Sequence, residues 1–95
     1  MPEDLETRRR KALWRAHHRG TKELDLLIGG YANRHLATMS ADELATFENL
    51  LVEQEPVLQR WLLAPVQPED VAPEIFTLVA AIRQFHGLDG ARDVQ

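Results

Sequence analysis

Apolar residues recur at the spacing of an α-helix along most of the chain, and this period limits the fold more than any other feature. Within each of several segments, leucine, isoleucine and aromatic positions three or four residues apart define one face. β-branched residues never alternate with polar ones over the length of a strand. The sequence therefore predicts an all-α protein, a compact bundle of five short helices.

Residues that start and stop helices divide this period into its segments. Ser40-Ala41-Asp42-Glu43 reads as a capping box, in which the serine and the glutamate side chains each accept a backbone N–H. Glu55-Pro56 breaks the pattern and restarts it, because proline suits the first position of a helix. The expected helices cover residues 3–18, residues 21–36 after an N-cap at Thr21, residues 41–51, residues 55–63 and residues 73–86.

Glycines add three expectations to this pattern. Gly20 and Gly87 are expected to end helices, since glycine tolerates the left-handed conformation common at helix ends. Gly29 and Gly30 lie inside the second predicted helix, where each costs about 1 kcal/mol relative to alanine. The pair therefore indicates that a neighbour packs closely against the helix backbone, or that the helix is kinked there.

The length and composition limit the organisation of the chain and its location. With 95 residues we expect one helical domain over residues 1–95, with an ordered core at about 5–87 and a frayed tail at 88–95. The absence of cysteine excludes disulfides and thiolate metal sites, and fits a reducing compartment. No apolar run reaches the roughly 18 residues of a membrane span, and the N-terminus lacks the apolar centre of a secretory signal. These features predict a cytoplasmic protein without a membrane segment.

Charge is distributed unevenly along the chain. Residues 1–23 hold seven of the eleven basic groups and four acids, whereas residues 24–95 hold four basic groups and eleven acids. The run Arg8-Arg9-Arg10-Lys11 suits either a nucleic acid or an acidic protein surface. No zinc-finger, homeodomain or RNA-binding signature accompanies the run, which favours a protein partner over a nucleic acid.

The residues that could carry chemistry lack the spacing that chemistry needs. His17 and His18 point about 100° apart on a helix, so they do not share a metal ion easily. Ser40 is the only serine and is committed to a cap, and Gly29-Gly30 has neither the strand nor the lysine of a phosphate loop. We therefore expect no catalytic residue, no metal and no stably bound cofactor. The chain is expected to act by binding another protein.

The segment Arg19-Gly20-Thr21-Lys22-Glu23 admits two interpretations. In the first, Arg19 and Glu23 form an ordinary pair four residues apart, worth about 0.2–0.5 kcal/mol, and Gly20 only separates two helices. In the second, Arg19 is exposed at the junction to bind a partner's carboxylates or carbonyls, and Gly20 lets the partner's backbone approach. Trp14, about one and a half turns earlier, would be an aromatic anchor beside it.

The same segment carries a resemblance to a known family. Arg19 to Glu23 matches the R-G-x-x-E motif of the succinate dehydrogenase flavinylation factors, also called FAD assembly factors. The setting is similar too: a basic first helix with Trp14, the continuation to Asp25, the Ser40–Phe47 region, and the segment from Glu55-Pro56 to Trp61-Leu62. The resemblance covers residues 8–86. One departure is Gln54-Glu55, where the family has two acids.

The resemblance implies a five-helix chaperone that promotes covalent attachment of FAD to the flavoprotein subunit of succinate dehydrogenase, and in some bacteria of fumarate reductase. The histidine that accepts FAD would belong to that subunit, and the factor would be a monomer when free. Arg19 and Gly20 would form the contact pair, with Glu23 contacting the partner or orienting Arg19. Trp14 and Asp25 complete the partner-binding residues that we expect.

Two consequences distinguish this interpretation from others. If Arg19 is an exposed contact, Arg19→Ala should leave folding intact and impair flavinylation. The alternative is an antitoxin or a regulatory protein-binding adaptor, which would not change the flavin content of the dehydrogenase.

Overall fold

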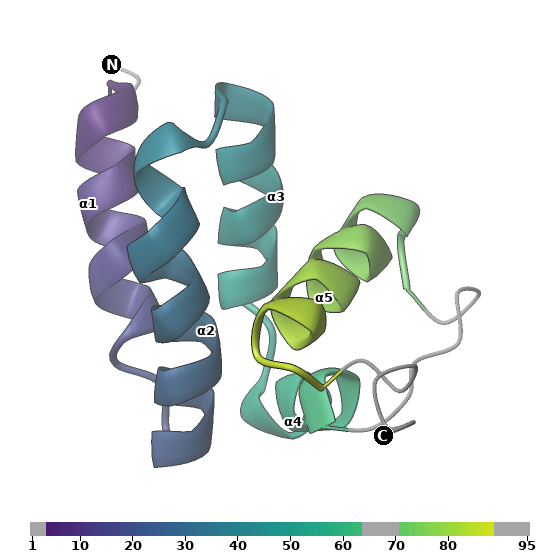
Figure 1. The fold of residues 1–95 in the computed structure, drawn as a ribbon. Coiled ribbons are helices and arrows are strands. Elements are labelled where there is room, and N and C mark those ends of the chain that lie inside the picture. Colours follow the sequence, from purple (N-terminus) through teal and green to yellow (C-terminus); the bar gives the residue numbers. More distant parts are fainter. Residues whose placement is uncertain (1–3, 64–70, 89–95) are drawn as a thin grey trace.

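The computed structural model describes residues 4–63 and 71–88, and most of these residues are helical. No strand occurs in these two ranges, so the predicted all-α fold of five helices is confirmed (Figure 1). The elements are α1 (Leu5–Ala16), α2 (Lys22–His35), the short 3-10 helix η1 (Leu36–Thr38), α3 (Ala41–Leu51), α4 (Glu55–Leu63) and α5 (Pro73–Phe85).

The first three helices stand side by side and alternate in direction, as Figure 1 shows. α1 packs against both α2 and α3, and α5 packs across α2 and α3. The short α4 lies at the end of the bundle where α1 passes into α2, and it contacts α2 and α5. This arrangement brings the α1–α2 connection close to the turn between α3 and α4.

The predicted caps are present at two helix starts. The Thr21 hydroxyl accepts the Leu24 N–H at 3.3 Å at the start of α2. At α3, Ser40 Oγ accepts the Glu43 N–H at 3.1 Å, and Glu43 Oε1 accepts the Ser40 N–H at 2.8 Å. The capping box is therefore confirmed, and each side chain satisfies a backbone donor that has no partner within the helix.

The core consists of the apolar faces that the helical period predicted. All five α-helices and η1 contribute to it, and Phe47 of α3 is its largest fully buried side chain. Some apolar residues of the helices lie nearer the surface: Trp61 is only partly buried, and Phe85 is exposed at the end of α5. The buried apolar residues are Ala12, Ala16, Leu24, Ile28, Ala32, Leu36, Met39, Leu44, Phe47, Leu50, Leu51, Leu58, Leu62, Val79 and Ile82.

The predicted end of the first helix and the predicted left-handed conformation of Gly20 were wrong. α1 ends at Ala16 with His17 as its C-cap, which is two residues before the predicted end. Gly20 does not have a left-handed backbone; in the described ranges Gly87 is the residue with positive φ, at 75°. Gly87 therefore ends its helix as predicted, and Gly20 requires another explanation. The predictions for residues 1–3, 64–70 and 89–95 lie outside the described residues.

The glycines inside α2 are explained by close packing, one of the two predicted alternatives. A Cβ atom at Gly29 would lie 2.6 Å from Nδ1 of His17, and one at Gly30 would lie 3.1 Å from Cε1 of His86. Both rings are fixed there, because His17 Nε2 is hydrogen-bonded to Asn33 Oδ1 at 2.9 Å and His86 Nε2 donates to the Leu27 carbonyl at 2.7 Å. The two histidines thus act as packing groups on the backbone of α2.

We predict that Gly29→Ala destabilises the protein by about 1–2 kcal/mol. Displacing the His17 ring should cost more free energy than alanine gains through its higher helix propensity. Gly30→Ala is the matched control, since its added methyl group meets only the edge of the His86 ring. Urea unfolding of the two variants measures the difference. A Gly29→Ala variant as stable as Gly30→Ala would contradict the packing argument.

The basic run of α1 is used in holding the bundle together. Arg8 pairs with Glu48 of α3 at 2.8 Å, and Arg9 Nη2 donates to the Met39 carbonyl at 2.7 Å. Arg10 lies on the exposed face, 3.7 Å from Glu6. The run therefore has a structural role in attaching α1 to its neighbours.

Each described helix is too short or too polar to cross a membrane.

Candidate functional site at the junction of the first two helices

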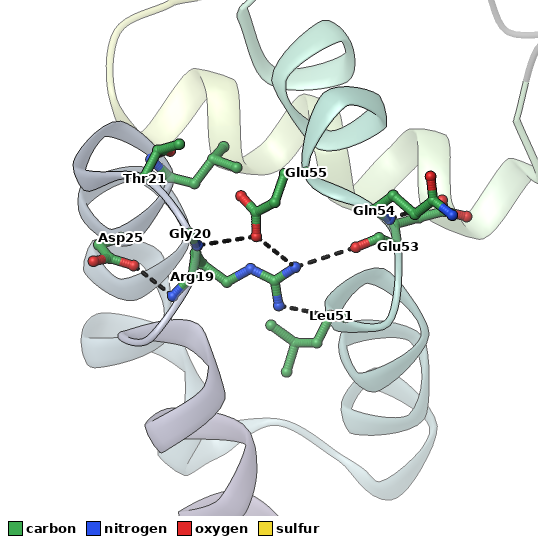
Figure 2. A network of polar contacts seen from close by, with 9 residues as sticks. Arg19, Gly20, Thr21, Asp25, Leu51, Glu53, Gln54 and Glu55 are labelled. Atoms are coloured by element: carbon green, nitrogen blue, oxygen red, sulfur yellow. Dashed lines mark hydrogen bonds and ion pairs between the residues drawn. The ribbon is translucent and has the colours of Figure 1, made fainter.

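Residues 17–21 connect α1 to α2 beside the turn between α3 and α4, as Figure 2 shows. The connection is held at its centre by Asp25, whose Oδ1 accepts the Arg19 N–H at 2.6 Å. Asp25 is in the first turn of α2, where a carboxylate is stabilised by the positive end of the helix dipole. The backbone of Arg19 is therefore fixed relative to α2.

The side chain of Arg19 points into the chain and binds the α3–α4 turn (Figure 2). Its Nη1 donates to the Leu51 carbonyl at 2.7 Å, and its Nη2 donates to the Glu53 carbonyl at 3.2 Å. Carbonyls at the end of a helix have no partner within it, and the guanidinium supplies two donors in a fixed geometry. Only 10% of the Arg19 side chain is exposed.

Glu55 completes this network from the first residue of α4. Its Oε2 lies 3.3 Å from Arg19 Nη2 and also accepts the Gly20 N–H at 3.0 Å. The Glu55 side chain is 33% exposed, so the ion pair is partly shielded from water. One carboxylate thus joins two consecutive residues of the α1–α2 connection to the start of α4.

The structure corrects both earlier interpretations of Arg19. The prediction that its side chain is exposed was wrong, because the α3–α4 turn covers it. In the described ranges its ion-pair partner is Glu55, whereas Glu23 lies exposed on the first turn of α2. The structure therefore brings Arg19, Gly20 and Asp25 together, and it leaves Glu23 outside this network.

Trp14 lies exposed near the end of α1, with 62% of its surface accessible. Its ring stacks on that of His18, with centroids 3.9 Å apart and an interplanar angle of 11°. His18 Nδ1 donates to the Trp14 carbonyl at 2.7 Å, which holds the ring in place. We refer to Trp14, His18, Gly20 and Glu23, all exposed, as the exposed junction residues.

Sequence reasoning missed two participants, His18 and Glu55. His18 was considered only as a metal ligand, although it follows Trp14 by four residues, and its ring stacks on that of Trp14 just beyond the end of α1. Glu55 lies 35 residues from Gly20, and the sequence marked it only as a helix start. The departure Gln54-Glu55 gave a signal, because it showed which of the two positions keeps its acid.

In residues 4–63 and 71–88 no group of three or more histidines and acids could hold a metal ion. A groove of about 550 Å³ lies between α2, α3 and α5, and its lining includes Tyr31, Glu43 and Glu74. Burial and the nearby Glu43 carboxylate raise the pKa of Tyr31. Two carboxylates in the lining would repel the phosphates of a dinucleotide.

Comparisons with known proteins agree with the motif. A family model described as "Flavinator of succinate dehydrogenase" matches residues 10–86. An FAD assembly factor of Acetobacter pasteurianus is 40% identical over 87 residues, which are 90% of this chain and 80% of that protein. An FAD assembly factor of Acinetobacter baylyi is 32% identical over 92% of this chain and 100% of its own length. A mitochondrial succinate dehydrogenase assembly factor 2 of Dictyostelium discoideum is 30% identical over 80% of this chain and 55% of its own.

Proposed function

The chain belongs to the succinate dehydrogenase flavinator family, and from this we propose that it is an assembly factor for the flavoprotein subunit of succinate dehydrogenase. It binds that subunit and promotes the covalent attachment of FAD to it. The single observation that supports this role best is the junction itself, where the family's R-G-x-x-E segment is fixed between α2 and the α3–α4 turn.

The proposed binding surface divides the predicted site residues into two groups. Trp14 and Glu23 are exposed and contact the partner through their side chains, and Gly20 contacts it through its exposed backbone. Arg19 and Asp25 hold the junction in its conformation through the contacts described above. A rigid aromatic residue beside a fixed backbone turn is typical of the residues that dominate binding energy at interfaces.

The proposed mechanism is selective binding. The subunit provides FAD and the accepting histidine, and the factor favours the conformation in which the two can react. Each 1.4 kcal/mol of preference for that conformation raises its population about tenfold relative to the others. No residue of this chain takes part in bond formation and no FAD is held stably on it. We propose further that the chain acts in the cytoplasm as a monomer, and that it also promotes FAD attachment to the flavoprotein subunit of fumarate reductase.

Reconstitution tests the function. The flavoprotein subunit is produced with and without this chain in cells that lack their own factor, and covalent flavin is measured by fluorescence on a denaturing gel. We expect strong fluorescence only when the chain is present. Equal labelling in both samples would overturn the proposed function, and binding without a change in labelling would favour the adaptor interpretation.

A further inference from the structure

We propose that Glu55 is the positioning residue of the Arg19-Gly20 segment, and that position 20 is a glycine because the Glu55 carboxylate occupies the space beside it. The contacts stand on the structure alone, and only the effect on the partner depends on the proposed function. The inference assigns the glycine of the motif to a contact within the chain, where the sequence had suggested an approach by the partner.

The geometry of the carboxylate supports a positioning role. A single oxygen, Oε2, binds donors from both residues: the Gly20 N–H at 3.0 Å and Arg19 Nη2 at 3.3 Å. The other oxygen, Oε1, is buried and has no hydrogen-bond partner among the residues that the structure describes. Because both contacts converge on one atom, loss of the carboxylate removes a restraint from the backbone of Gly20 and from the Arg19 side chain at once, although the Leu51 and Glu53 carbonyls still hold the guanidinium.

The space around Gly20 explains its identity. Its φ is not positive, so the backbone conformation itself does not require glycine. A Cβ atom there would lie 3.3 Å from Cδ of Glu55, which is a tight contact, and 3.4 Å from Cγ, at the limit of ordinary van der Waals contact. A side chain at position 20 would therefore require the Glu55 carboxyl group to move by a few tenths of an ångström relative to its two donors.

The other acids near the junction do not perform this task. In the described ranges Asp25 binds the backbone N–H of Arg19, whereas the Arg19 guanidinium pairs with Glu55. Glu23 is exposed on α2 and lies outside the network. Of the three acids, Glu55 is the one that binds both the Arg19 side chain and the Gly20 backbone.

A double-mutant cycle tests the inference. The dissociation constant for the purified flavoprotein subunit is measured by calorimetry for the wild-type chain, Gly20→Ala, Glu55→Ala and the double variant. We expect Glu55→Ala to weaken binding about tenfold and Gly20→Ala about fivefold, with less than about a twofold further loss from Gly20→Ala once Glu55 is absent. An equal loss from Gly20→Ala in both backgrounds would overturn the inference, since the glycine would then serve the partner.

Two further variants keep the test decisive. Glu74→Ala removes an exposed acid from the first turn of α5, and it controls for the loss of a charge near a helix start. Glu55→Gln retains the size of the side chain, so Gly20→Ala should remain harmful in that background. If Glu55→Ala does not fold, Glu55→Asp replaces it, because the shorter side chain withdraws the carboxylate from the space beside position 20. Gly20→Ala should then weaken binding less than it does in the wild type, and an equal loss would overturn the inference.

An additional readout separates this inference from the proposed function. If the wild-type chain does not bind the subunit, the proposed function fails, and the inference is judged by the amide resonance of Gly20 in the free chain. We expect this resonance to shift in Glu55→Ala and to stay in place in Glu74→Ala. An unchanged Gly20 resonance in Glu55→Ala would overturn the positioning role.

Discussion

Replacing Arg19 with alanine is expected to lower the free energy of unfolding by about 2–4 kcal/mol. The substitution leaves the Leu51 and Glu53 carbonyls without their donor, and the Glu55 carboxylate without its counter-ion. These groups lie in a partly buried site, where loss of one partner costs more than it does on the surface. Flavinylation should fall as well, because the junction loses its link to the α3–α4 turn. Urea unfolding and flavin fluorescence of the subunit measure the two effects.

The control for this prediction is Arg10→Ala. Arg10 is an exposed arginine of α1 with a weak contact to Glu6, so its loss should change stability by less than about 0.5 kcal/mol. Flavinylation is then compared at a temperature where all variants are folded. If Arg19→Ala proves as stable as Arg10→Ala but loses activity, Arg19 serves the partner directly, as the exposed interpretation required.

Trp14→Ala is expected to weaken binding with little effect on stability, whereas Arg19→Ala is expected to lower the stability. The Trp14 side chain is largely exposed and makes its ring contact with His18, which lies just beyond the end of α1, so the fold should be affected little. Binding to the flavoprotein subunit should weaken by about 2 kcal/mol, or roughly 30-fold, since a large aromatic side chain at an interface is a frequent hot spot. Calorimetric titration gives the dissociation constant, and thermal unfolding gives the stability.

Leu63→Ala provides the matched variant for Trp14→Ala. Leu63 is another large exposed apolar residue, 44% exposed, at the end of α4 and outside the exposed junction residues. It should leave binding within about twofold of the wild type. Equal losses in the two variants would mean that the partner recognises apolar surface in general, and would contradict a specific contact at Trp14.

The helices and their caps could be predicted because their signals are local. The Ser40–Glu43 capping box and the apolar face of α3 depend on residues within four positions of one another. The packing against Gly29 could also be predicted, because a glycine inside a helix is unfavourable without a reason. Which side chain packs there could not, since His17 reaches it only after α1 and α2 fold against each other.

The burial of Arg19 could not be predicted for the same reason. Its partners at residues 51–55 are more than thirty positions away, and the helical period describes the faces of helices without describing which ends meet. The motif singled out the junction at which the structure brings Arg19, Gly20 and Asp25 together. It did not reveal that the arginine faces inward, because an arginine at a junction has the same local sequence whether it binds its own chain or another.

The link between Gly20 and Glu55 also connects folding to activity. The junction reaches its final conformation only after the chain has been extended through α4 and that helix has docked, because one of the groups that fix it belongs to α4. A nascent or partly unfolded chain that contains the complete R-G-x-x-E segment would lack this restraint on it. Recognition by the partner would then report that the factor has folded through α4, so that a less complete factor would not compete for the flavoprotein subunit.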